Sequence, residues 1–243
     1  MILAGDVGGT NTRLGIFSAD GVTKHRVQVF PSDAKSTFTA IAKKFLAEGS
    51  EKVTRACVGV AGPVIDGKCN ATNLPWVLDA KKIGKGLGVE SFTLINDLAA
   101  VARGSLAVSR RKLGVLQAGQ PVAHQAGNVA VIAAGTGLGE ALLIWDGKRH
   151  VSCATEGGHT DFAPRNKQEV ELLEFLQKKV GGRVSFERVL SGPGLGHLYD
   201  FFTDVVGVGE TQAASDAITT ADDRNAVISE LTLAGKSKPA QRA

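Results

Sequence analysis

The sequence has no long apolar run and few cysteines, and each absence excludes a class of protein. No apolar segment approaches the roughly 20 residues that a helix needs to span a bilayer, and the N-terminus lacks the basic and apolar regions of a secretory signal. The three cysteines, Cys57, Cys69 and Cys153, are widely spaced and form no C-x-x-C pair or cluster with histidine. We therefore expect a cytoplasmic protein with reduced thiols and no membrane partner.

Aromatic residues are also scarce, at 5% of the chain, and the net charge is only +4. Short basic clusters occur at residues 81–85 and 110–112, but no aromatic side chains are interleaved with them to stack on bases. We interpret these clusters as solvated faces and expect no nucleic-acid partner. The hydrophobic content of 43% over 243 residues is that of an ordinary globular protein with one large or two small domains.

A glycine-rich segment near the N-terminus, Gly-Asp-Val-Gly-Gly-Thr-Asn-Thr-Arg at residues 5–13, joins two apolar runs and so predicts a β-hairpin. Adjacent glycines, Gly8 and Gly9, let backbone N–H groups converge on one point, which suits a phosphate. Thr10 and Asn11 add side-chain donors. Asp6 would repel a phosphate unless a divalent cation stood between them, so the segment suggests a Mg²⁺–nucleotide complex. The alternative is a tight hairpin with an aspartate in a turn.

The pattern after this hairpin predicts alternating strands and helices. Asp20-Gly21 signals a turn before a third strand at residues 22–30, which makes a meander. The next helix has an apolar face of Phe38, Ile41, Ala42, Phe45 and Leu46. We expect residues 31–33 to open that helix and Gly49 to end it. After it we expect a strand at 53–61, an irregular binding or closing loop at 62–78, a helix at 79–87 and a strand at 92–95.

Asn96 and Asp97 follow that last strand and precede a predicted helix at residues 98–103. Ligands of α/β sheets bind beyond the carboxyl ends of the strands. Asp97 could accept a hydroxyl proton there, while Asn96 hydrogen-bonds a polar ligand. Both residue types are also good helix N-caps, which is the structural alternative.

The pattern of strand, glycine turn and strand recurs after a connecting region at residues 104–128. We place the domain boundary near residue 108. A buried strand at 129–134, a turn Gly135-Thr136-Gly137-Leu138-Gly139 and a strand at 140–145 follow. The glycine spacing is superficially that of a dinucleotide fingerprint, but a strand follows it instead of a helix, so the Rossmann interpretation fails. Two such units suggest two similar domains that offer amides to one phosphate chain.

Polar groups are dense at residues 156–164. Glu156 and His159 could be zinc ligands, but no third and fourth ligands are obvious. Hydrogen bonding to a polyhydroxylated ligand is favoured, since a carboxylate accepts and an imidazole can donate or accept. Beyond this segment we expect helices at 167–180, from Pro193 to about 204 and at 211–233, with Val170, Leu173, Leu176 and Val180 on one face of the first, and a disordered basic tail at 234–243.

Together these motifs resemble the bacterial glucokinase family, with its two-domain α/β, actin-like (ribonuclease H-like) sugar kinase fold. The matching segments run collinearly from residue 1 to about residue 230 and are residues 5–11, 95–97, 135–139, 156–164 and 187–194. A related repressor and kinase family fits less well, because its zinc-binding Cys/His motif is absent here.

This resemblance implies phosphorylation of the glucose 6-hydroxyl by ATP with Mg²⁺, and a homodimer as an open alternative to a monomer. It implies that Asp97 is the general base and that Asn96, Asp97, Glu156, His159 and Glu187 contact glucose. It further implies that Asp6 assists Mg²⁺, through water, and that Gly8, Gly9, Thr10, Asn11, Gly135, Thr136 and Gly137 cradle the phosphates.

The chain departs from the family pattern near Leu231, where the family continues with a helix, a strand, a glycine-rich adenosine motif and a terminal helix. We therefore expect a small α/β domain at residues 1–108, an incomplete large domain at 109–233 and the tail at 234–243, as in a truncated product. The alternative function is an inactive or weak sugar-binding or regulatory remnant.

Overall fold

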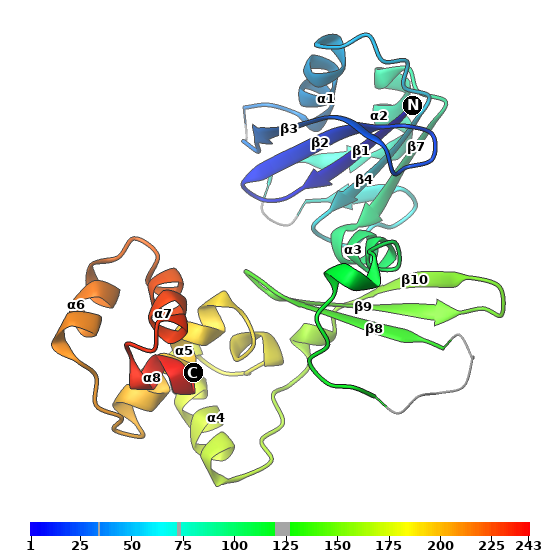
Figure 1. Cartoon of the computed structure of the whole chain (residues 1–243). Coiled ribbons are helices and arrows are strands. Elements are labelled where there is room, and N and C mark those ends of the chain that lie inside the picture. The colour runs from blue at the N-terminus through cyan, green and yellow to red at the C-terminus, as the bar shows by residue number, and fades with distance from the viewer. Residues whose placement is uncertain (34, 72–73, 120–126) are drawn as a thin grey trace. The chain divides into compact units, whose positions relative to one another are not determined.

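The computed structural model describes residues 1–33, 35–71, 74–119 and 127–243. It divides into two compact units (Figure 1): the first holds residues 1–129 and 142–154, and the second holds residues 130–141 and 155–243. The division lies further along the chain than the boundary expected near residue 108. In the described ranges, no helix is both long enough and apolar enough to cross a membrane.

The first unit is built on a five-stranded sheet of order β3-β2-β1-β4-β7. Its strands are β1 (Ile2–Val7), β2 (Asn11–Phe17), β3 (Lys24–Pro31), β4 (Arg55–Val60) and β7 (Ser91–Asn96). The first three strands pair antiparallel, which confirms the predicted hairpin and meander. Strands β4 and β7 run parallel to β1.

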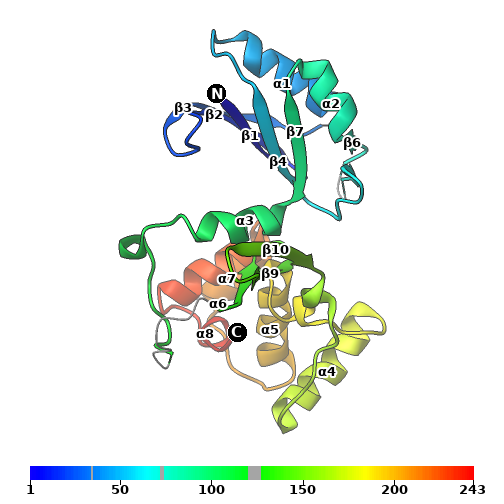
Figure 2. The same ribbon diagram turned by 90° about the vertical axis from the view of Figure 1, so that its right-hand side faces the viewer.

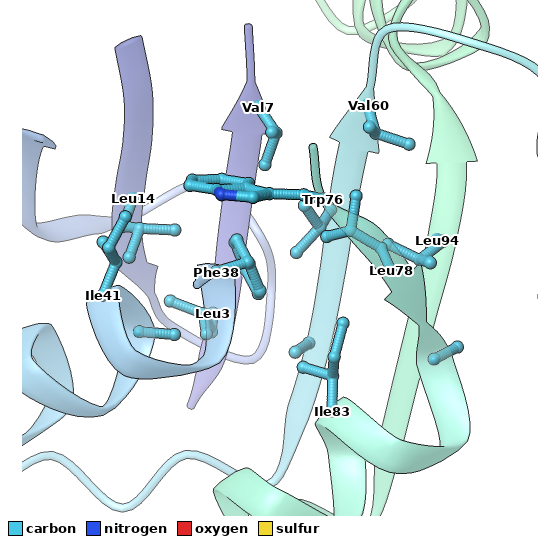
Figure 3. Close-up of a cluster of buried hydrophobic side chains, with 14 of the residues drawn as sticks. Leu3, Val7, Leu14, Phe38, Ile41, Val60, Trp76, Leu78, Ile83 and Leu94 are labelled. Atoms are coloured by element: carbon cyan, nitrogen blue, oxygen red, sulfur yellow. The ribbon is translucent and has the colours of Figure 1, made fainter. Parts of the chain in front are cut away.

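The core of the first unit lies on one face of this sheet. Alternation along each strand directs every second side chain to that face, so Leu3 pairs in register with Ile16 on one side and with Ala56 on the other. Helices α1 (Phe38–Ala47) and α2 (Ala80–Leu87) lie side by side over it (Figure 2). Phe38 and Ile83 from these helices meet the strand residues in the core (Figure 3).

The predicted apolar face of α1 and its end before Gly49 are confirmed, but its predicted start is wrong. Phe38, Ile41, Ala42 and Phe45 are buried. The helix begins after Thr37, whose side chain accepts a hydrogen bond from Ala40 N. It ends at Ala47, with Glu48 as its C-cap and Gly49 directly after the cap. Pro31 is instead the last residue of β3, and Asp33 Oδ1 accepts a hydrogen bond from Lys35 N at 2.8 Å, before the helix begins.

The segment at residues 62–78 is more regular than expected. It contains β5 (Lys68–Asn70), which pairs antiparallel with β6 (Val77–Asp79). Trp76 is buried in the core, and its ring nitrogen donates to Asp33 O at 3.1 Å. Residues 72–73 of this predicted loop lie outside the described residues.

A three-stranded sheet of order β10-β9-β8 occupies the middle of the chain. Its strands are β8 (Val129–Ala134), β9 (Leu138–Trp145) and β10 (His150–Thr155), so the predicted strand, glycine turn and strand are confirmed. The predicted burial of the first strand is wrong, because β8 is an edge strand and none of its residues is buried. The division between the two units passes through these strands. The predicted connecting region holds α3 (Asp97–Ser105) in part and the short 3-10 helix η1 (Arg110–Lys112), and its residues 120–126 lie outside the described residues.

The helices of the second unit are α4 (Lys167–Val180), α5 (Gly192–Asp204), α6 (Gln212–Thr220), α7 (Arg224–Leu233) and α8 (Lys238–Arg242). Helix α4 has the predicted bounds, but Leu172 and Leu176 are its buried residues, whereas Val170 is exposed. The single helix predicted at 211–233 is wrong, because Ala221 is extended and the Asp223 side chain caps a new helix by accepting from Asn225 N and Ala226 N.

The predicted disordered tail is wrong as well. Ser237 Oγ accepts a hydrogen bond from Ala240 N and so caps α8, which packs against α5 and α7. Ala240 is fully buried, and Ser237 also contacts the Glu210 carboxylate. The buried residues Pro239 and Ala240 and the buried Ser237 hydroxyl thus hold this basic segment in a fixed position, which its composition did not indicate.

A charged cluster joins three helices of the second unit. Asp200 on α5 accepts from both guanidinium nitrogens of Arg224 on α7, at 2.6 and 3.1 Å, and from Lys179 Nζ on α4 at 2.7 Å. Burial alone would raise the pKa of Asp200, but the hydrogen bonds and charges of Arg224 and Lys179 outweigh it and lower that pKa. We call these three residues the Asp200 cluster.

Candidate functional site

The carboxyl ends of three parallel strands meet at one edge of the sheet in the first unit. Val7 on β1 is in register with Val60 on β4, and Val60 is in register with Asn96 on β7. Ala61 N donates to Val7 O at 3.4 Å, so the segments that leave these strands stay together. This edge therefore gathers the first glycine turn and the Asn96-Asp97 pair, as the sequence predicts.

The first glycine turn connects β1 to β2. Gly8 N donates to Asn11 O at 3.0 Å, while Gly9, Thr10 and Asn11 are exposed. Thr10 O accepts from Ser32 N at 2.8 Å, which anchors the far side of the turn to the end of β3. The segment is thus the predicted hairpin, and its exposed residues are accessible to a ligand.

Asp6 ends the β1 side of this hairpin with an exposed carboxylate. It forms an ion pair with Arg13 across the strand pair, with 3.9 Å between Arg13 Nη1 and Asp6 Oδ2 and with both side chains more than 60% exposed. An ion pair of this length in solvent contributes little to stability. Mg²⁺ usually keeps several waters and takes one or two carboxylates together with substrate phosphates, so one accessible carboxylate beside a glycine turn fits that ion.

Asn96 is the N-cap of α3, so the structural alternative holds for its side-chain oxygen. Asn96 Oδ1 accepts from Ala99 N at 3.1 Å, and Nδ2 donates to Gly62 O at 3.3 Å. The amide thereby links the end of β7 to the segment after β4 and fixes the start of the helix.

Asp97 is the first residue of α3 and is half-buried. Its Oδ1 accepts from Leu98 N at 2.8 Å. Burial raises the pKa of the Cys69 thiol, and the negative charge of Asp97 raises it further. Gly59 on β4 packs beside this helix start, where an added Cβ would be in ordinary van der Waals contact at 3.6 Å from Asp97 Cα.

The second glycine turn is tied to the start of α5. Gly135 N donates to Gly137 O at 2.8 Å, and Gly135 O accepts from Gly192 N at 2.7 Å. Ser191 caps α5 by accepting from Gly194 N at 3.0 Å, and it donates to Glu187 O at 2.7 Å. The sequence gives no local sign of this connection, because its partners are more than 50 residues apart.

Glu187 lies against the second glycine turn. Leu138 N donates to Glu187 Oε2 at 3.0 Å, and the same oxygen is 2.5 Å from the position of a Cβ added to Gly137. Glu187 belongs to the short 3-10 helix η3 (Phe186–Arg188). A residue predicted to hold a sugar hydroxyl is therefore bonded to the end of a turn predicted to hold a phosphate.

Glu156 precedes the short 3-10 helix η2 (Gly157–His159), and His159 is its last residue. Their side chains approach to 3.7 Å between Oε2 and Nε2, and both are more than half exposed. An added Cβ on Gly158 would collide with Leu138 O, so this glycine permits the segment to lie directly on β9. No group of three or more His, Cys, Asp or Glu side chains is placed to hold a metal ion in the described part of the chain.

Arg183 holds this segment in place and was not singled out from the sequence. Its Nε is 2.8 Å from Asp161 Oδ1, and its guanidinium also donates to His159 O. The Phe162 N to Val184 O bond, at 2.9 Å, continues the same pairing toward η3. An arginine three residues after the end of α4 carries no sequence signal for this contact.

The structure brings the predicted residues together in two groups. In the first unit, the carboxyl edge of the sheet gathers Asp6, Gly8, Gly9, Thr10, Asn11, Asn96 and Asp97. In the second unit, the start of β9 gathers Gly135, Thr136, Gly137, Glu156, His159 and Glu187. Each group combines carboxylates with a glycine turn, which is a combination suited to a phosphorylated ligand and a polar acceptor.

Comparisons with known proteins show the family of the chain. A family model described as glucokinase matches residues 3–243. A glucokinase of Synechocystis sp. is 40% identical over 214 residues, which cover 82% of this chain and 60% of the relative. A glucokinase of Trichormus variabilis is 38% identical over 211 residues, which cover 84% of this chain and 61% of the relative. The chain thus spans about 60% of the length of these curated relatives.

Solved structures give the same result for the fold. The crystal structure of a glucokinase from an Antarctic psychrotroph superposes with a TM-score of 0.74 at 30% identity, over 95% of this chain and 74% of that one. A Balamuthia mandrillaris glucokinase in complex with glucose gives a TM-score of 0.69 at 21% identity, over 98% of this chain and 77% of that one. The α/β fold is therefore that of the actin-like sugar kinases, and the chain belongs to the glucokinase family.

Proposed function

We propose that this chain phosphorylates the 6-hydroxyl of D-glucose with Mg-ATP and yields glucose 6-phosphate and ADP. The observation that carries the proposal is the sheet edge of the first unit, where an accessible glycine turn, the Asp6 carboxylate and the Asn96-Asp97 pair lie together. A phosphate cradle, a cation ligand and a proton acceptor are the parts that phosphoryl transfer requires. Membership of the glucokinase family supports glucose as the acceptor and ATP as the donor.

The roles of the acceptor side follow from the chemistry of each group. Asp97 accepts the proton of the 6-hydroxyl as the oxygen attacks the terminal phosphorus of ATP. Asn96, Glu156, His159 and Glu187 hydrogen-bond the other sugar hydroxyls. The half-buried position of Asp97 at the start of α3 and the two side-chain bonds of Asn96 support a fixed geometry for this pair.

The roles of the donor side fall to the two glycine turns. The backbone amides of Gly8, Gly9 and Thr10, with Asn11, and those of Gly135, Thr136 and Gly137 hold the phosphates. Asp6 holds Mg²⁺ through water, and the ion neutralises charge on the phosphate oxygens when bound. The exposed Asp6 carboxylate and the exposed first turn support this assignment.

The proposal is tested by measuring glucose-dependent ADP release from the purified chain and from Asp97→Asn. General-base catalysis typically contributes about 10²- to 10⁴-fold, so we expect the variant to lose about that much of kcat while its circular dichroism spectrum is unchanged. Release that is independent of glucose, or equal in both proteins, would contradict the proposal. Glucose binding without any ADP release would instead support the alternative of a sugar-binding protein.

A further inference from the structure

The Glu187 carboxylate occupies a place where it opposes a phosphate. Oε2 takes the hydrogen bond of Leu138 N at 3.0 Å and stands 2.5 Å from the Cβ position of Gly137. Its charge therefore lies directly on the backbone of the second glycine turn. Among the described residues, no lysine or arginine forms an ion pair with Glu187 that would neutralise this charge.

A phosphate at this turn meets two obstacles while Glu187 stays there. Two negative charges a few ångströms apart repel each other, and the repulsion is stronger near protein than in bulk water. The Leu138 N–H is also already used, and an amide hydrogen bonds well to only one acceptor at a time. A phosphate binds better here once the carboxylate has moved away.

The carboxylate can move without disturbing the chain around it. The backbone of Glu187 is held separately, because its carbonyl accepts from Ser191 Oγ at 2.7 Å. The side chain reaches Leu138 through rotatable bonds, so a competing donor can turn it while η3 and the start of α5 remain in place.

Resting on the proposed function, we propose that Glu187 couples sugar binding to nucleotide binding. Without sugar, the carboxylate holds Leu138 N–H and shields the turn from phosphate. A sugar hydroxyl then donates to the carboxylate in place of Leu138 N, which frees the amide and removes charge from the turn. Coupling between two ligands is reciprocal, so bound nucleotide raises the affinity for glucose by the same factor.

The test is calorimetric titration of magnesium adenylyl imidodiphosphate, which is not hydrolysed, into the chain with and without saturating glucose. For the native chain we expect glucose to tighten nucleotide binding by about fivefold or more, the usual lower range of such coupling. For Glu187→Gln, which keeps the shape and removes the charge, we expect tighter nucleotide binding without glucose and a ratio near one. An unchanged ratio in this variant would overturn the inference.

Glu140→Gln is the matched control. This carboxylate also packs on a glycine, since its Oε2 would collide with a Cβ on Gly157, whereas the Glu187 carboxylate packs on Gly137 of the second glycine turn. The control should keep the native coupling ratio. A loss of coupling in the control equal to that in Glu187→Gln would assign the effect to charge in general and overturn the specific role of Glu187.

A second measurement needs no variant. Saturating glucose should speed hydrogen exchange of the Leu138 amide, because that amide loses its acceptor, and unchanged exchange would overturn the inference. If the native chain is folded but binds neither glucose nor the nucleotide analogue, the proposed function itself fails. If it binds both with no coupling, only the role of Glu187 fails.

Discussion

Strands β1 and β8 have the same local pattern and different surroundings. Each is a short apolar strand that enters a glycine turn and then a second strand. In the first unit β1 has a neighbour on both sides, β2 and β4, and its Leu3 and Val7 are at most 1% exposed. In the three-stranded sheet β8 lies at the edge, and none of its residues Val129–Ala134 is buried.

The comparison teaches that a strand's burial is set by its neighbours and not by its own sequence. The apolar residues of β1 stabilise the fold because α1 and α2 cover the sheet and because β4 pairs with β1 along the edge opposite β2. The valine and isoleucine residues of β8 contribute less, since much of their surface stays in water. The glycine turns differ as well: the first is exposed, whereas Glu187 lies on the second.

The largest predicted difference between these strands is in stability. Leu3→Ala empties a fully buried position and should lower the free energy of unfolding by about 2–5 kcal/mol. Ile132→Ala removes a side chain that is 67% exposed and should change it by less than about 0.5 kcal/mol. Urea unfolding measures both, followed by Trp76 emission for Leu3→Ala and by the emission of Trp145, on β9 of the three-stranded sheet, for Ile132→Ala. Equal losses would break the comparison.

The stability of the second unit should fall in acid because of the Asp200 cluster, whereas the first unit is stabilised by an apolar core. The pKa of Asp200 is lower when folded than when unfolded, so its stabilisation is present above the ordinary aspartate pKa and is lost as pH falls through the folded value. Asp200→Asn should cost about 1–3 kcal/mol at pH 7, less than a fully buried pair because Lys179 and Arg224 are partly exposed.

Hydrogen exchange of α5 and α7 as a function of pH measures this effect. The matched control is Asp204→Asn on the same helix, an exposed residue whose change should be within about 0.5 kcal/mol. Equal protection of α5 in native chain and Asp200→Asn between pH 3 and 7 would contradict the role of the cluster.

The smallest effect is expected at the Asp6–Arg13 pair. Arg13→Gln should change the free energy of unfolding by less than about 0.5 kcal/mol, because both side chains are exposed and 3.9 Å separates their charged atoms. Thermal unfolding measures it, with Arg26→Gln as the contrasting variant, since Arg26 donates to Phe45 O and to the less exposed Glu51. A larger loss for Arg13→Gln than for Arg26→Gln would reverse this ranking.

Local periodicity predicts much of this fold. The β1–β2 hairpin, the buried face of α1 and the bounds of α4 all follow from spacing along the chain. The break at Ala221 and the helix at Lys238–Arg242 do not, because side-chain caps at Asp223 and Ser237 and contacts with distant helices decide them.

The candidate site could be predicted in its residues but not in its contacts. The motifs locate Asn96, Asp97 and Glu187, and the rule for parallel strands places the first two at a sheet edge. The bond from Leu138 N to Glu187 joins residues 49 positions apart, and the Arg183 contact with His159 joins residues 24 apart. No local pattern encodes such pairs, since they depend on how β9, η2 and η3 pack.

The measurement that tests the central claim most directly is phosphorus NMR of the chain with Mg-ATP and either glucose or 6-deoxyglucose. We predict a phosphomonoester signal with glucose that is absent with 6-deoxyglucose, which lacks the acceptor hydroxyl, and that forms at least about 100-fold more slowly with Asp97→Asn. A signal that forms equally fast in the variant, or inorganic phosphate as the only product, would contradict the account.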